Sequence, residues 1–560
     1  MKYNSRIANA AALVWMLALL APATAQSQQP QVPSQPSVGQ VPQPEGLLLG
    51  GPSAFAAPAA ARLPQSSALL DPYVTATSHQ PATAPLPPPS ADDDLAELTK
   101  RLEAAENNLA AMRNESKGAA DKLLDLLSKK PAGPELPLIR LSGFFQVDDG
   151  LFSQTADSRA VLGDIKDGVG FRRARLQALG ALTEFTRYSI EFDFAINGRP
   201  SFLDVWGEQA NLPFFGTIRI GHFRQPTSMD GLTSIRHLEF LERNMSFQAM
   251  DPFRRTGIMA YRVSEDEMST IAYSTYATGF TFFNGVDTSY NTIGDTRYAN
   301  EIGDSGGISF AIRGTHLLYY DEPAEGRYLL HLGGGYDFSE LGGEGTTGPF
   351  AKAYEARSIP EFFVGDSAAL GLTAAGTPFV VDSGRILAKN FHFAHVELAG
   401  NYGAAHFQTE FLGTSLNQLN GPPVFFYGAY MQAGYFLTGE SAGYNKQTGV
   451  MDYNVKPYSE FFGTGAKGNV CGWGAWELAF RWSYLNVAAT NIESGNLLPG
   501  TPGPPPVPNA GQVNESTVAL NWWWNQYTRV QFNWIHSMPD YNAFGYAPFD
   551  IFGTRFQIEF

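Results

Sequence analysis

Apolar and polar residues alternate strictly in many segments after residue 137. The last segment is the clearest case, because its apolar residues alternate with polar ones: Phe552, Phe556, Ile558 and Phe560 against Arg555, Gln557 and Glu559. A period of two predicts a β-strand, in which successive side chains point to opposite faces. The chain is therefore predicted to close with a strand that has one apolar face and one polar face.

The same alternation recurs along the rest of this region. Splitting the alternating segments at turn signals predicts about sixteen strands of roughly ten residues. The segments lie near 139–148, 171–178, 187–196, 202–223, 255–277, 306–314, 327–337, 387–413, 425–438, 472–488, 513–524 and 528–537.

The length and the charges of these strands indicate their surroundings. Strands of soluble proteins average about five or six residues, whereas about ten residues cross a bilayer at a tilt. The polar faces carry Arg173, Glu191, Asp193 and Arg529, which a closed soluble core would not accept. We therefore expect an all-β fold, a transmembrane antiparallel β-barrel of about sixteen strands over 138–560, with lipid outside and an aqueous pore inside.

The residues before the barrel predict three further parts. Residues 1–25 read as a signal peptide, with a basic start, the apolar run "AALVWMLALLA" and the cleavage signal "ATA". Residues 26–91, rich in Pro, Gln and Ala, predict a disordered tether. Residues 92–130 carry a leucine-rich heptad series that predicts a short α-helical coiled coil, with a single amphipathic helix as the alternative.

Composition excludes several classes of function. The net charge of −16 argues against nucleic-acid binding. Cys471 is the one cysteine, so no Cys-rich metal site is possible. His392 and His395 are three positions apart on a predicted strand and would point to opposite faces. We predict no metal, no cofactor and, since no motif selects a nucleophile with its base, no enzyme.

Four motifs in order over 138–560 carry a family resemblance. They are "FRRA" at 171–174, the stretch 215–257 with Leu241-Glu242-Arg243, "GYFLTGE" at 434–440, and the hairpin segments 474–485 and 519–537. Together they resemble the phosphate-selective porin O and P family of bacterial outer-membrane porins. The resemblance implies a homotrimer with short periplasmic turns, long external loops and one loop folded inward, which we expect to be 278–305.

The resemblance also implies which residues bind small anions such as phosphate or polyphosphate in the pore. These are Arg172, Arg173, Arg175 and Arg357, with Asp204 near the binding site. Guanidinium groups suit this role because they bind phosphate with two parallel hydrogen bonds and stay charged.

The sequence departs from the family pattern at points that bear on selectivity. Gly231 stands where the phosphate-selective members have a lysine, and Arg357 is the lone arginine of 351–366. Residues 138–560 contain 28 basic and 42 acidic residues. A general non-specific or cation-leaning porin therefore stays open as an alternative, and so does a barrel that mainly anchors the periplasmic stem 92–130.

These expectations place the protein in the cell outer membrane with its N-terminal stem in the periplasm. The expected partners are two further copies of the chain, membrane lipid and small anions or other small solutes. The terminal Phe560 resembles the signal that the outer-membrane assembly machinery reads.

Overall fold

The computed structural model describes most of the region after residue 135. The described residues are 99–100, 102–104, 107, 136–195, 201–278, 307–341, 346, 352–364, 377–465, 468–470, 472–493, 495–498 and 510–560. The chain divides into two compact units, Met1–Arg113 and Asn114–Phe560. In the first unit the described residues are helical. The predicted signal peptide and tether lie outside the described residues, as does most of the predicted coiled coil.

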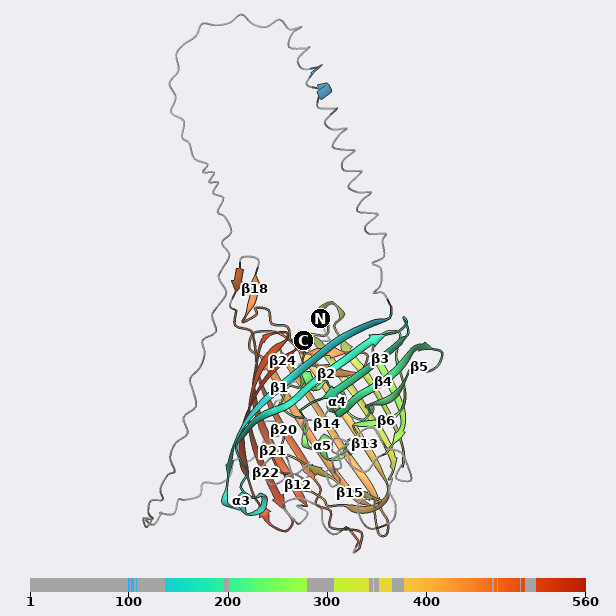
Figure 1. Cartoon of the computed structure of the whole chain (residues 1–560), viewed down its shortest axis with the longest axis vertical. Helices are drawn as coiled ribbons and strands as arrows, with labels where there is room; N and C mark the ends of the chain where they lie inside the picture. The colour runs from blue at the N-terminus through green and yellow to red at the C-terminus, as the bar shows by residue number, and fades with distance from the viewer. Residues whose placement is uncertain are drawn as a thin grey trace, which may run out of the picture. The chain divides into compact units, whose positions relative to one another are not determined.

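Sixteen long antiparallel strands form a closed barrel in the second unit (Figure 1), and the two-residue strands β10 (Ala353–Tyr354) and β23 (Gly545–Tyr546) extend the same sheet. The strand β1 pairs with β2 on one side and with β24 on the other, which closes the sheet. The prediction of about sixteen strands is confirmed. They are β1 (Leu138–Gln154), β2 (Gly168–Ala181), β3 (Thr186–Asp193), β4 (Ser201–Leu212), β5 (Gly216–Arg224), β6 (Arg254–Val263), β7 (Ser269–Ala277), β8 (Ile308–Tyr320), β9 (Tyr328–Glu340), β13 (Ile386–Tyr402), β14 (Ala405–Gln418), β15 (Val424–Phe436), β20 (Ala475–Asn486), β21 (Gly511–Asn525), β22 (Thr528–Tyr541) and β24 (Phe549–Glu559).

The two faces of the strands have opposite burial and chemistry. In β24 the side chain of Phe552 is 50 % exposed, whereas Arg555 is fully buried. In β3 Ile190 is exposed, and its neighbours Ser189 and Glu191 are buried. In these strands apolar residues face outward and charged residues face inward, the reverse of a soluble protein. This is the arrangement that the alternation predicted, and it suits a barrel surrounded by lipid.

The connections at the two ends of the barrel differ in length. At the end that holds the C-terminus, most strands are joined by short turns, such as 213–215, 403–404 and 526–527. We call it the short-turn end. The opposite end carries the longer connections, including 155–167 with α3 (Ala156–Leu162) and 341–385 with β10 (Ala353–Tyr354), β11 (Arg357–Ser358) and β12 (Val381–Asp382). Among the described residues, no helix has the length and apolar character needed to cross a membrane.

One connection at the short-turn end is long. Residues 437–474 join β15 to β20 and form two hairpins. The first pairs β16 (Gly443–Asn445) with β17 (Val450–Asp452), and the second pairs β18 (Gly463–Gly465) with β19 (Gly468–Val470). The second hairpin stands clear of the barrel wall (Figure 1).

The connection between β5 and β6, residues 225–253, folds into the barrel interior. It contains α4 (Met229–Leu232), the 3-10 turn η1 (Ile235–His237) and α5 (Met245–Met250). Its backbone carbonyls accept hydrogen bonds from four strands of the wall: Leu238 from Arg529, Glu239 from Asn521, Leu241 from Arg555 and Glu242 from Arg481. We call residues 225–253 the inward segment.

The inward segment differs from the loop that the sequence led us to expect. We expected 278–305 to fold inward, and residues 279–306 lie outside the described part of the chain. In 225–253, charged and amide side chains of distant strands satisfy the loop carbonyls, so the path of this segment depends on partners that local alternation does not reveal.

Apolar side chains inside the barrel gather in two layers. The first lies toward the long-connection end and includes Leu241, Phe362, Phe391, Ile535 and Ile551. The second lies toward the short-turn end and includes Met229, Phe436, Met451, Tyr453 and Trp523. Buried charged groups of the wall, such as Arg173 and Arg313, fill positions of the interior that these layers do not occupy.

Candidate functional site

A β-bulge brings two consecutive arginines to the same side of the wall. Gln146 of β1 lies opposite Arg173, and the next residue, Val147, lies opposite Phe171. Arg172 is therefore an extra residue without a partner in the pairing of β1 with β2. A bulge of this kind reorients side chains, so that Arg172 and Arg173 can approach one group although neighbouring strand residues normally point apart.

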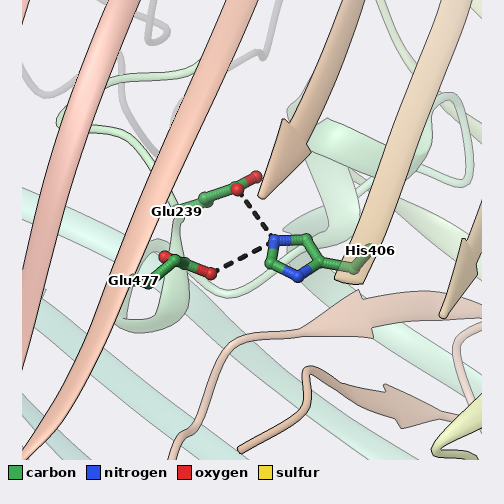
Figure 2. A group of neighbouring side chains, drawn as sticks. All are labelled: Glu239, His406 and Glu477. Atoms are coloured by element: carbon green, nitrogen blue, oxygen red, sulfur yellow. Dashed lines mark hydrogen bonds and ion pairs between the residues drawn. The ribbon is translucent and has the colours of Figure 1, made fainter. Parts of the chain in front are cut away.

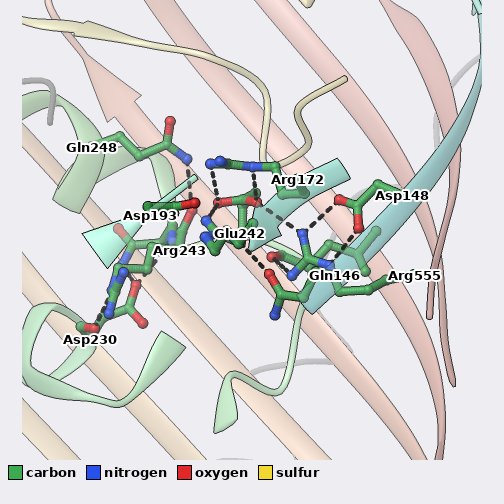
Figure 3. A network of polar contacts seen from close by, with 12 residues as sticks. Gln146, Asp148, Arg172, Asp193, Asp230, Glu242, Arg243, Gln248 and Arg555 are labelled. Atoms are coloured by element: carbon green, nitrogen blue, oxygen red, sulfur yellow. Dashed lines mark hydrogen bonds and ion pairs between the residues drawn. The ribbon is translucent and has the colours of Figure 1, made fainter. Parts of the chain in front are cut away.

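That shared group is the carboxylate of Glu242 on the inward segment (Figure 3). Arg172 donates from Nε to Oε1 over 2.8 Å and from Nη2 to Oε2 over 3.2 Å. Arg173 donates from Nη2 to Oε2 over 2.7 Å. Arg555, from the closing strand, donates from Nη2 to Oε1 over 3.0 Å. Three guanidinium groups thus surround one carboxylate.

Arg555 connects this cluster to a second carboxylate. It donates two hydrogen bonds of 2.7 Å to the oxygens of Asp148 on β1. We call Arg172, Arg173, Arg555, Glu242 and Asp148 the arginine network. With three positive and two negative groups, the network carries one excess positive charge.

The surroundings of Glu242 determine its ionisation. Burial by itself raises the pKa of its carboxyl, because a buried carboxylate loses its hydration. Arg172, Arg173 and Arg555 act in the opposite direction and outweigh burial, so that the pKa lies well below its ordinary value. Glu242 therefore stays ionised at neutral pH. Its contribution to stability is present above the ordinary pKa of a glutamate and is lost as the pH falls through the lowered value.

Arg175 and Asp204 belong to a neighbouring chain of ion pairs. Arg175 donates from Nε to Asp193 over 2.8 Å, and Arg254 donates from Nε to Asp204 over 2.9 Å. Glu191 lies between them, 3.9 Å from Arg175 and 3.7 Å from Arg254. The structure therefore connects Arg175 with Asp204 through residues of β3 and β6.

Arg357 has different surroundings. It lies on β11, in the connection 341–385. It forms an ion pair of 3.5 Å with Glu355, and its guanidinium lies 4.4 Å from the ring centre of Phe379. Within the described residues, no hydrogen bond or ion pair of Arg357 reaches the arginine network.

Sequence reasoning missed several members of these clusters. The sequence shows Arg555 among the polar residues of the last strand and Glu242 within the motif Leu241-Glu242-Arg243. It did not identify either residue as part of the site. Asp148 and Arg254 were also missed. The inward polar rows were visible in the alternation. Which arginine meets which acid depends on strand register and on the path of the inward segment.

The chemistry of the arginine network follows from its donors. Forked guanidinium groups bind carboxylates and phosphates with similar geometry. The carboxylate of Glu242 therefore occupies a position that suits a small oxyanion. An anion that reached Arg172, whose side chain is 12 % exposed, would compete with Glu242 for the same donors.

A family model described as phosphate-selective porin O and P matches residues 139–305 and 374–560. No curated protein sequence matches the chain.

Several solved structures are similar to this chain, among them an outer-membrane protein, an anion-selective porin and OprB. OmpT of Vibrio cholerae, in trimer form, is 9 % identical over 76 % of this chain and 100 % of its own, with a TM-score of 0.41. The anion-selective porin from Comamonas acidovorans is 11 % identical over 76 % and 99 %, with a TM-score of 0.41. OprB of Pseudomonas putida is 8 % identical over 76 % and 94 %, with a TM-score of 0.39.

Proposed function

Because the chain belongs to the phosphate-selective porin O and P family, we propose that its pore prefers small oxyanions and that the arginine network sets this preference. The protein is an outer-membrane porin through which small solutes diffuse passively. Family and fold point to a channel rather than an enzyme. To this passive diffusion of small solutes our proposal adds a preference for phosphate-like anions.

The observation that carries the proposal is the excess of guanidinium groups around Glu242. Three arginines contact one carboxylate on the inward segment, at hydrogen-bond distances from 2.7 to 3.2 Å. A local excess of positive charge raises the local concentration of anions, whatever the net charge of the whole chain. The acidic balance of 138–560 therefore does not by itself exclude an anion-preferring pore.

The proposed mechanism is an exchange of hydrogen-bond acceptors at the arginines. A passing oxyanion takes hydrogen bonds from Arg172 and Arg173 while Glu242 gives them up, and Glu242 recovers them when the anion leaves. Binding is then favourable enough for entry and weak enough for release, as conduction requires. Arg175 and Arg357 are proposed to bind anions on either side of this step, and Asp204 to reduce the positive charge near Arg175.

Replacing both Arg172 and Arg173 with Ala tests the proposal directly. We expect the permeability of anions relative to cations to fall by at least about twofold, because two fixed positive charges leave the pore. Reversal potentials of purified protein in planar bilayers, measured in chloride and in phosphate gradients, report this ratio. The double variant Arg159→Ala/Arg187→Ala is the control, because it also removes two arginines and both of their side chains are exposed.

Glu242→Gln provides the opposite change at the same place. Loss of this negative charge leaves the arginines with a larger excess of positive charge, so we expect anion preference and phosphate affinity to rise. Identical reversal potentials for wild type and both variants would contradict the proposal and favour a general porin. A cation-selective wild type would favour the cation-leaning alternative, and an absence of conductance would favour a barrel that mainly anchors the stem.

Other expectations about assembly stay predictions. We propose a homotrimer, which the family resemblance implies; the heptad series within 92–130 would add self-association but does not by itself fix three strands. The periplasmic position of this stem is proposed from the predicted export of the chain, the contact with membrane lipid from the apolar rows of the strands, and the reading of Phe560 by the assembly machinery from its resemblance to the terminal signal. In the structure Phe560 is 63 % exposed, and its backbone pairs with Gly143 of β1.

A further inference from the structure

A second polar cluster, separate from the arginine network, joins the inward segment to the wall. Glu239 of the inward segment, His406 of β14 and Glu477 of β20 converge (Figure 2). The Nε2 atom of His406 lies 2.8 Å from Oε1 of Glu239 and 3.1 Å from Oε1 of Glu477. One ligand atom from each residue lies within 4.8 Å of the other two, and all three side chains are buried.

The outer oxygen of each carboxylate is held by an amide. Gln432 donates from Nε2 to Oε2 of Glu239 over 2.7 Å, and Asn521 donates from Nδ2 to Oε2 of Glu477 over 2.7 Å. The two Oε1 atoms are thereby left facing the imidazole. Hydrogen bonds that orient ligand carboxylates in this way are typical of the shell around protein metal ions.

The hydrogen bonds inside the cluster are incomplete. The Nε2 atom of an imidazole can donate a single proton, and Glu239 accepts the hydrogen bond. Oε1 of Glu477 is buried without a hydrogen bond, although it points toward the same nitrogen. Two carboxylates facing one imidazole also leave negative charge in a buried place, which is costly unless a cation balances it.

We propose that Glu239, His406 and Glu477 bind a divalent transition-metal ion, with Zn²⁺ as the best-fitting example. One imidazole and two carboxylates are ligands that Zn²⁺ accepts at about 2.0–2.2 Å in tetrahedral geometry, which places ligand atoms about 3.3 Å apart. The observed separations from His406 are 2.8 and 3.1 Å. Shifts of a few tenths of an ångström would therefore admit the ion, and a water would complete its coordination.

Metal binding would have a mechanical consequence. Glu239 lies on the inward segment, whereas His406 and Glu477 lie on two different strands of the wall. A bound ion would replace a hydrogen bond with coordinate bonds between the segment and the wall. It would thus hold the inward segment in place beside Leu241, whose carbonyl accepts from Arg555, and Glu242, which belongs to the arginine network.

A cluster of similar composition provides the control. His395, Glu397 and Glu410 also lie close together. Glu397 accepts hydrogen bonds from Arg313, one of them 2.7 Å long. Glu410 accepts from the backbone amides of Met229 and Asp230 over 2.8 and 3.0 Å. The carboxylates of this cluster are already satisfied by protein donors, so we expect no metal there.

The test measures Zn²⁺ bound by the full-length mature protein, purified in detergent, treated with a chelator and then dialysed against Zn²⁺. We expect about one ion per chain for the wild type, and an affinity at least about tenfold lower for His406→Gln and Glu477→Gln. His395→Gln is the matched control and should bind like the wild type. Heat-dependent mobility in gels confirms that each variant is folded.

If a ligand variant does not fold, X-ray absorption of the Zn²⁺-loaded wild type still tests the site, because it reports how many imidazole and oxygen ligands surround the ion. One imidazole among oxygen ligands supports the site, whereas no imidazole, or two or more, overturns it. A wild type that binds no more Zn²⁺ than His406→Gln overturns the proposal. So does an equal loss of affinity in His395→Gln. None of these outcomes depends on ion selectivity, so failure here leaves the proposed porin function untouched.

Discussion

Replacing Arg555 with Ala should lower the free energy of unfolding of the barrel by about 3–5 kcal/mol, the cost of removing one partner from a buried ion pair. Arg555 is fully buried and holds both oxygens of Asp148, as well as Glu242 and the carbonyl of Leu241. Its loss leaves Asp148 without its guanidinium partner and Glu242 with two of its three. Urea unfolding of the barrel in lipid vesicles, followed by tryptophan fluorescence, measures the change.

Two further variants define the origin of this effect. Arg159→Ala removes an arginine whose side chain is 58 % exposed and whose partner Asp164 is similarly exposed, and we expect its stability to stay within about 0.5 kcal/mol of the wild type. Combining Arg555→Ala with Asp148→Asn should cost less than the sum of the two single changes, because one stranded charge is then neutral. A loss below about 1 kcal/mol for Arg555→Ala would contradict the assignment of a buried, mutually dependent network.

Replacing the hairpin 443–452 with two glycines should raise the single-channel conductance several-fold. The hairpin enters the barrel from the short-turn end, where Arg313 donates to the carbonyls of Thr448 and Gly449 over 2.8 and 2.6 Å. Its residues Val450 and Met451 are buried among apolar side chains of the interior. Removing them widens the aqueous cross-section, and conductance in planar bilayers reports the width.

The short replacement is feasible because Gly443 and Asp452 are paired across the hairpin, so its ends lie side by side. Deleting 463–470 is the matched control. It removes the second hairpin of the same connection, which also has paired ends and stands clear of the wall (Figure 1). Equal conductance of wild type and the 443–452 variant, with both folded, would show that the hairpin does not limit the pore.

The hairpin and the inward segment also contact each other. His237 of the inward segment lies 2.8 Å from Asp452 at the end of β17. Met229 of the inward segment packs in the same apolar layer as Met451. A connection from the short-turn end and one from the opposite end therefore meet inside the barrel. Two connections therefore occupy the barrel interior, whereas the sequence led us to expect a single inward loop.

Alternation by itself determined the strands, their approximate number and the face that each residue occupies. In the closing strand, for example, it placed Phe552 outside and Arg555 inside, as observed. The reason is physical: a strand has two faces, and lipid and the polar interior select opposite side chains for them. This information lies within about ten neighbouring residues, so it can be read without any knowledge of the fold.

Only the tertiary structure decided which groups meet. Arg172 turns inward because a bulge interrupts the pairing of β1 with β2. Glu242 becomes the shared partner of three arginines because the inward segment crosses the barrel. Glu239 meets His406 and Glu477 for the same reason. Register and loop path join residues from 69 to 313 positions apart, and a period-two pattern carries no information about these contacts.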